Sequence, residues 1–219
     1  MATRTLRKEI RRPDEFITGT AKALEYAQTH QRTVAWIAAA VVGVILLGVA
    51  YTSFRSSRWQ QANASLARGM ALYNENKLPE AIKAFDEMAS QPSNPENFLE
   101  IARLYSAQAQ LRQGEFARAV AAFDVAQGGM DGFLEQRAVV NHGFALEGNQ
   151  QFAEAAAAFA RAVATGGPYT AVAVLGEARN WDRSGDKAKA KTAYEKYISQ
   201  YPDAPEKAVA EARLAALGD

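Results

Sequence analysis

The chain has 219 residues, of which 48% are hydrophobic and 22% charged, so a wholly disordered or collagen-like chain is excluded. Its 25 basic and 24 acidic residues leave a net charge of +1, which gives no overall electrostatic attraction for nucleic acid. There is no cysteine, and the only histidines are His30 and His142, which excludes disulfides, thiolate zinc sites and histidine-rich metal centres. These exclusions disfavour an enzyme.

Residues 1–32 form a basic N-terminal tail. They hold seven Lys or Arg against four acidic residues, a net charge of +3. Pro13 followed by Asp14 and Glu15 is typical of a helix start, and a loose apolar stripe follows at Phe16, Ala23, Leu24 and Ala27. Two interpretations stay open: a short amphipathic helix attracted to anionic lipid, or a determinant of membrane topology alone.

Residues 33–54 are an uncharged run of 22 residues, from Thr33 to Phe54. At a rise of ~1.5 Å per residue such a helix spans roughly 33 Å, which matches the ~30 Å hydrocarbon core of a bilayer. Trp36 and Tyr51 lie where aromatic residues anchor a span at the interface. We predict an uncleaved transmembrane helix. The alternatives are a buried core helix and a signal peptide cleaved near residues 48–50, for which the apolar stretch and the preceding tail are too long.

The orientation of this span follows from the flanking charge. Seven basic residues precede it, and only Arg55 and Arg58 follow directly, so the positive-inside rule predicts that residues 1–32 lie in the cytoplasm and the rest of the chain outside it. The reversed topology, with the C-terminal part in the cytoplasm, is the alternative. Within the span, Ala39 and Gly43 form a small-xxx-small pair that predicts a helix-packing face in the membrane, unless the alanines merely fill the span.

After the span, residues 55–219 repeat one block four times. The block reads LPEAIKAF at 78–85, FARAVAAF at 116–123, FAEAAAAF at 152–159 and KAKAKTAY at 187–194, so its marker alanines recur at periods of 38, 36 and 35 residues. A loop signal precedes each block, at Asn76, Gly114, Asn149-Gln150 and Gly185-Asp186. About a dozen helix-forming residues precede each loop. Periods of this length indicate stacked helix pairs.

This pattern resembles the tetratricopeptide repeat, a helix-turn-helix unit, over roughly residues 62–202. The family has small residues where its two helices cross, and ten of the twelve corresponding positions here are Gly or Ala: Gly69, Ala81, Met88, Ala107, Ala119, Ala126, Gly143, Ala155, Ala162, Ala178, Ala190 and Tyr197. The family aromatic is kept as Phe85, Phe123, Phe159 and Tyr194. The expected fold is therefore all-α: a transmembrane helix, then an α-solenoid of about four helix pairs.

The first helices depart from the family pattern. The seventh position, usually large and apolar, holds Arg68, Ser106, His142 and Glu177. In the fourth copy, Leu175-Gly176 is an alternative match with two extra loop residues. Residues 204–217 predict a final amphipathic helix, with Val209, Leu214 and Leu217 apolar, of the kind that caps a solenoid.

The sequence carries no motif for catalysis or for a cofactor. It lacks phosphate-binding glycine loops, HExxH, GxSxG and EF-hand patterns. His142 falls at a repeat position, where packing or the surface explains it. We therefore expect no catalytic residue, metal or cofactor.

The expected functional surface is the groove that stacked first helices create. The family register places partner-binding residues at Met70, Tyr73, Asn74, Gln108, Leu111, Arg112, Val140, Phe144, Glu147, Arg179, Asp182 and Arg183. Aromatic and amide groups beside arginine suit a peptide, because they offer apolar anchors and charge-assisted hydrogen bonds.

The layout of basic tail, single span, aromatic juxtamembrane segment at 51–59 and helical repeats is similar to the YfgM-type tetratricopeptide proteins of Gram-negative inner membranes. That resemblance implies an ancillary subunit of the Sec translocon that helps pass emerging chains to periplasmic chaperones. The rival interpretation is a scaffold for another envelope complex, such as cell division, cytochrome maturation or secretion. An enzyme fused to an anchor is the third.

Overall fold

The structure is a computed structural model that describes residues 26, 28–126 and 132–218. All the regular elements in these residues are helices, so the all-α prediction is confirmed. The predicted amphipathic helix of the tail lies outside the described residues. The chain divides into two compact units, Met1–Ser56 and Ser57–Asp219, and each is described by itself.

In the first unit, the described chain is the N-terminal part of helix α2, which runs from Gln31 to Asn74. Its most apolar stretch has a mean hydropathy of 2.5 and none of that stretch is buried, so the interpretation as a core helix is wrong. Trp36 and Leu47 are 77% and 72% exposed. The helix is long and apolar enough to cross a membrane, although a signal sequence near an N-terminus meets the same criteria.

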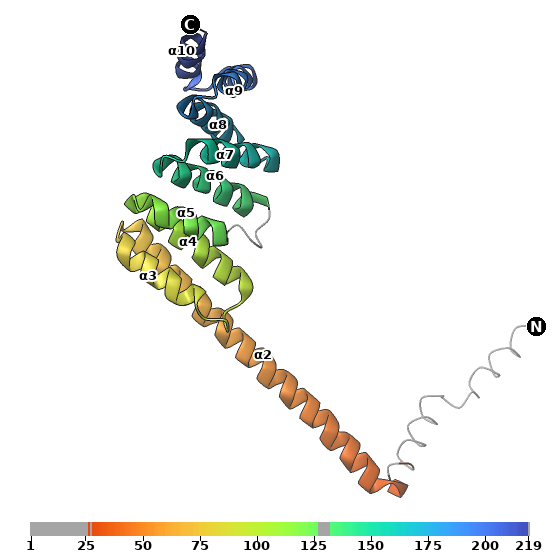
Figure 1. Cartoon of the computed structure of the whole chain (residues 1–219). Coiled ribbons are helices and arrows are strands. Elements are labelled where there is room, and N and C mark those ends of the chain that lie inside the picture. The colour runs from red at the N-terminus through yellow and green to blue at the C-terminus, as the bar shows by residue number, and fades with distance from the viewer. Residues whose placement is uncertain (1–25, 27, 127–131, 219) are drawn as a thin grey trace, which may run out of the picture. The chain divides into compact units, whose positions relative to one another are not determined.

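The second unit is a succession of antiparallel helix pairs, visible along the colour gradient of Figure 1. The last part of α2 is followed by α3 (Leu78–Ala89), α4 (Glu96–Gln113), α5 (Phe116–Ala126), α6 (Gly132–Gly148), α7 (Phe152–Thr165), α8 (Thr170–Ser184), α9 (Lys187–Gln200) and α10 (Lys207–Leu217). From α3 onward each helix packs mainly against the next in the chain. This nearest-neighbour packing is that of a solenoid.

The turn within each helix pair requires a left-handed backbone, and the predicted loop signals supply it. Gly114 and Gly185 have φ of 83° and 87°, which glycine adopts without steric cost. In the other two pairs Asn76 and Gln150 take this conformation, with φ of 61° and 62°. Asp186 then starts α9, where its Oδ1 accepts a hydrogen bond from the Lys189 amide at 3.1 Å.

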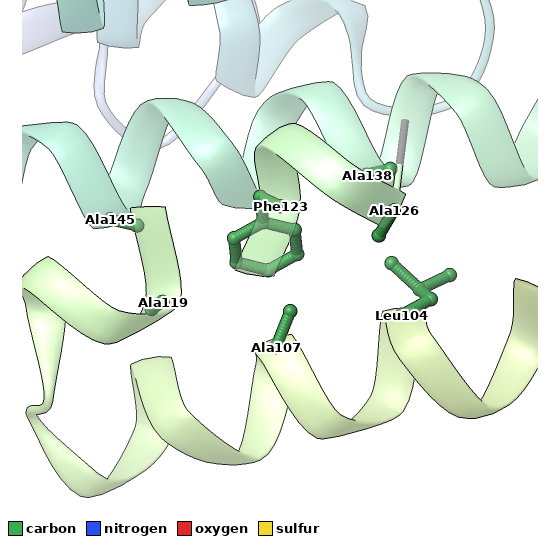
Figure 2. Packing of buried hydrophobic residues seen from close by; sticks show 7 residues of the cluster. All are labelled: Leu104, Ala107, Ala119, Phe123, Ala126, Ala138 and Ala145. Carbon is green, nitrogen blue, oxygen red and sulfur yellow. The ribbon is translucent and has the colours of Figure 1, made fainter. Parts of the chain in front are cut away.

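Each helix pair buries the aromatic ring of its block among small residues, together with other large apolar side chains such as Leu104 and Val174. All twelve predicted crossing positions are buried, and the four aromatic positions are at most 2% exposed. Figure 2 shows the second of these rings, Phe123, with Ala107 of α4 and Ala138 and Ala145 of α6 around it. Because alanine lets two helix backbones approach closely, the pattern of small residues places each ring at a helix crossing.

At the seventh position of two repeats, the polar residue contacts an aspartate of the preceding helix pair. Ser106 donates a hydrogen bond to Asp86 at 2.6 Å, and His142 Nε2 lies 3.4 Å from Asp124 Oδ1. Asp86 and Asp124 each follow the aromatic residue of their own block. At Ser106 a hydrogen bond therefore replaces the usual apolar contact, since an unpaired buried polar group is costly, whereas the contact of His142 with Asp124 is not a hydrogen bond.

The fourth pair keeps the family register, and the alternative match at Leu175-Gly176 is wrong. Ala178 packs in one cluster with Tyr194, the aromatic of its own pair. A Cβ added at Gly176 would lie 2.9 Å from the ring of Phe159, which belongs to the pair before. Gly176 therefore serves the contact between pairs rather than the crossing within one.

The final helix begins later than predicted, at Lys207 instead of residue 204. Leu214 and Leu217 pack against the cluster around Tyr194 and Tyr197, as the capping interpretation requires. Val209 is 61% exposed and does not contribute to that packing.

Candidate functional site

The structure brings several predicted groove residues together in one hollow of ≈ 260 Å³ on the first-helix face. We call it the arginine hollow, and its lining residues are Tyr73, Gln108, Leu111, Arg112, Arg137, Val140, Asn141 and Tyr169. They come from α2, α4 and α6, with Tyr169 immediately before α8. Five of the eight are predicted groove positions. The structure therefore brings these five positions together, and their role in binding a partner stays a prediction.

Arginine and tyrosine hold one another in place inside the hollow. The Arg112 guanidinium lies 5.3 Å from the centre of the Tyr73 ring, and its Nη1 donates to the Tyr73 carbonyl at 3.2 Å. The Arg137 guanidinium lies 5.1 Å from the centre of the Tyr105 ring, and its Nη2 donates to Gln108 Oε1 at 2.7 Å. Both arginines are thus oriented by neutral groups, and none of the described residues that line the hollow carries a carboxylate.

A second hollow, of ≈ 390 Å³, lies between α8 and the C-terminal helix. Its lining residues are Leu175, Arg179, Asp182, Arg183, Tyr194, Glu206, Val209 and Arg213. Arg179, Asp182 and Arg183 are predicted groove residues, whereas the α10 contribution was not anticipated. Helix α10 occupies the place that the first helix of a further pair would take.

The predicted residue Glu147 joins two of the three arginines of this second hollow, Arg179 and Arg183. Its Oε2 accepts from Arg179 Nη2 at 2.6 Å, and its Oε1 accepts from Arg179 Nε and Arg183 Nη1, both at 2.8 Å. The Glu147 side chain is only 13% exposed. Burial alone would raise the pKa of Glu147, but the hydrogen bonds and charges of Arg179 and Arg183 outweigh it and lower that pKa. The single carboxylate of Glu147 therefore offsets part of the charge of these two arginines.

The remaining predicted residues lie outside the two hollows. Met70 packs against the core around Phe85, and the Phe144 ring meets Phe159 edge-on at 5.1 Å, so both contribute to packing. Asn74 is exposed at the end of α2. In the first unit, Ala39 is exposed, and a Cβ added at Gly43 would meet nothing within 4 Å. The membrane-packing role of Ala39 and Gly43 stays a prediction.

Sequence reasoning missed three residues of the arginine hollow: Arg137, Asn141 and Tyr169. Arg137 and Asn141 flank the predicted Val140 and Phe144 at helical spacing on α6, so extending that face by one turn would have found them. Tyr169 precedes α8, and only the tertiary structure places it here. Among the described residues, no group of three acidic or histidine side chains is arranged to hold a metal ion.

Two segments of the chain match family models described as tetratricopeptide repeat. One model matches residues 50–95, which cover the first helix pair, and another matches residues 173–204, which cover most of the fourth. The two pairs between them share the same buried small and aromatic positions. No curated protein matches the chain.

Solved structures show the same fold at low sequence identity. The nearly identical TPR-like repeats of a protein described as a kinesin light chain of Podosopora anserina align with a TM-score of 0.56 and 14% identity, over 72% of this chain and 85% of that one. A double mutant of MamA RS-1 aligns with a TM-score of 0.58 and 18% identity, over 72% and 88%. Two segments of the chain therefore match the tetratricopeptide repeat, a protein–protein interaction module, and the fold is that of TPR-like α-solenoids.

Proposed function

We propose that this chain is a membrane-anchored module whose first-helix face binds a segment of another protein. The observation that carries the proposal is the arginine hollow, where side chains from three successive first helices converge on one concavity. Concave surfaces of this kind, with aromatic walls and a few polar groups, are where helical solenoids hold their ligands.

The anchor is part of the proposal. Residues 33–54 carry no charge, and the exposed apolar side chains of this part of α2 need a non-aqueous environment. With the basic tail in the cytoplasm, the repeats lie on the periplasmic side of a bacterial inner membrane. The resemblance to YfgM-type proteins supports a role beside the Sec translocon and its periplasmic chaperones. A scaffold for a different envelope complex is the second candidate, since a solenoid with a hollow built from three successive first helices also suits a single partner.

Topology is tested with single cysteines, because the natural chain has none. Variants Thr20→Cys and Ala121→Cys are expressed in intact cells and exposed to a maleimide that does not cross the inner membrane. We expect labelling at position 121 and none at position 20 until the membrane is opened. Labelling at position 20 alone would show the reversed topology. Recovery of the chain in the soluble fraction would show that α2 is no anchor.

Partner binding is tested by photocrosslinking in native membranes from Tyr73 and Arg112, with mass spectrometry of the adducts. Exposed positions on the second helices, Ala121 of α5 and Ala157 of α7, serve as matched controls. We expect adducts from the groove positions and not from the controls. Translocon subunits with many exported chains support the secretion role, and one stoichiometric envelope partner supports the scaffold. Equal adducts from both faces would contradict a binding groove.

A further inference from the structure

The two arginines of the arginine hollow differ in their partners from Arg179 and Arg183 of the second hollow. Arg179 and Arg183 share the carboxylate of Glu147. Arg112 and Arg137 instead donate to a backbone carbonyl and to a side-chain amide, at 3.2 and 2.7 Å. Among the described residues that line it, the arginine hollow therefore has two positive charges and no negative one. Two guanidiniums facing one concavity attract an anionic group, and a partly enclosed site strengthens that attraction.

Gln108 adds an independent observation, because it is a buried amide with a free donor. The residue is 5% exposed, and its Oε1 accepts the hydrogen bond from Arg137. That bond determines which end of the amide is the oxygen, so the atom left over is Nε2, which has no partner. A buried donor without an acceptor costs about 1–3 kcal/mol. Because Nε2 is itself buried, the donors that a ligand in the hollow reaches are the guanidinium groups of Arg112 and Arg137, and Gln108 orients Arg137 through its Oε1.

Aromatic residues at the two ends of the hollow indicate what surrounds the anion. Tyr73 lines it from α2, and Tyr169 lines it next to α8. Beyond Tyr169, the ring of Phe133 lies 5.7 Å away and is 51% exposed. Val172, three residues after Tyr169, is 46% exposed. Apolar contacts are therefore available on both sides of the charged centre.

We infer that the arginine hollow binds the side-chain carboxylates of an acidic peptide segment that carries apolar residues on either side of the acid. The inference rests on the proposed function and names its ligand class. A chain that runs through the hollow meets Tyr73 with one apolar residue and the Tyr169–Phe133 pair with another. A chain that ended at the arginines would leave one of these surfaces bare, so the carboxylates belong to Asp or Glu side chains rather than to a C-terminus.

The test uses the full chain in detergent micelles and fluorescent twelve-residue peptides, with binding followed by anisotropy. The probe is acetylated and amidated and contains Phe-Asp-Glu-Leu at its centre. Its matched control contains Phe-Asn-Gln-Leu. We expect the acidic peptide to bind at least tenfold more tightly than its amide counterpart, and to weaken as salt is raised.

Variants of the chain locate the binding. We expect the affinity for the acidic peptide to fall at least fivefold in each of two variants, Arg112→Gln and Arg137→Gln. Arg118→Gln on α5, a second-helix arginine outside the hollow, is the matched control and should leave binding unchanged. Arg112 is exposed, so its variant tests the inference even if Arg137→Gln, which also loses the contact with Tyr105, unfolds.

Three outcomes overturn the inference. They are equal binding of the acidic and amide peptides, unchanged binding in Arg112→Gln, and binding only when the probe ends in a free C-terminal carboxylate. If the acidic peptide shows no preferential binding while crosslinks from Tyr73 and Arg112 still capture a protein, the inferred ligand class is wrong and the proposed function stands. If the crosslinks fail as well, the proposed function is wrong.

Discussion

Gly143 of α6 lies directly against the ring of Phe159 on α7. A Cβ added to Gly143 would sit 2.9 Å from two ring carbons of Phe159, and the ring is fully buried. A Cβ added to Gly176, from the following pair, would meet the same ring at 2.9 Å. The ring is therefore held between two glycines and has no room to move away. A side chain of even one carbon is excluded at both positions, unlike at Ala107 beside Phe123.

We predict that Gly143→Ala lowers the free energy of unfolding by about 1–2 kcal/mol. Alanine favours a helix by about 1 kcal/mol over glycine, but overpacking a closed core costs about 1–3 kcal/mol, so the clash decides the sign. Thermal unfolding followed by circular dichroism in detergent gives the measurement. Combining Gly143→Ala with Phe159→Leu should cost less than the two single changes added together. Unchanged or increased stability of Gly143→Ala would contradict the packing described above.

We predict that the Glu147 carboxylate makes the free energy of unfolding fall as the pH becomes acidic. Its native pKa is lowered, so the stabilisation is present above the unfolded-state pKa and is lost as pH falls through the lower native value. We expect Glu147→Gln to lose about 1 kcal/mol at pH 7, because both arginines are partly solvated. Denaturant unfolding at several pH values below 5 should show a shallower pH dependence in the variant. A slope equal to that of the natural chain would show that the ion pair contributes nothing.

We predict that His142 also lowers the free energy of unfolding on acidification, but at a higher pH than Glu147 does. Burial lowers its pKa, and the nearby Asp124 opposes this only partly. The unfolded chain therefore binds a proton more readily than the native one, and stability falls as pH drops below the ordinary histidine value of about 6.5. We expect His142→Asn to remove this loss. The measurement is the unfolding midpoint in urea at pH 7.5 and pH 5.5, and an unchanged difference between the two would refute the prediction.

Helix α10 offers a matched pair of truncations. Leu214 packs against the cluster around Tyr194 and Tyr197, whereas Val209 is 61% exposed on the same helix. We expect Leu214→Ala to lower stability by about 1–2 kcal/mol, and Val209→Ala to change it by less than about 0.5 kcal/mol. Because pairs in a solenoid are stabilised by their neighbours, hydrogen exchange should increase in α9 for Leu214→Ala alone. Equal effects of the two changes would show that α10 does not cap the last pair.

The sequence by itself determined the repeating helix pairs. Helix turns, loop residues and the spacing of small and aromatic side chains are set locally, within a few residues of chain, so the block at 78–85 and its three copies predict their own helices and buried faces. The same locality explains why the apolar run at 33–54 is identified from composition alone. The family register then placed Tyr73, Gln108 and Arg112 on the groove face.

Only the tertiary structure decided which side chains from different helices meet. The bond from Arg137 to Gln108, the Ser106–Asp86 pair and the position of Tyr169 each join residues twenty or more apart in the chain or bring a loop onto a helix face. Glu147 was predicted to face a partner, yet the folded chain neutralises it with Arg179. Periodicity specifies the face of a helix on which a residue lies. The partner depends on how closely two helices approach and on their relative rotation, which the packing of the whole solenoid determines.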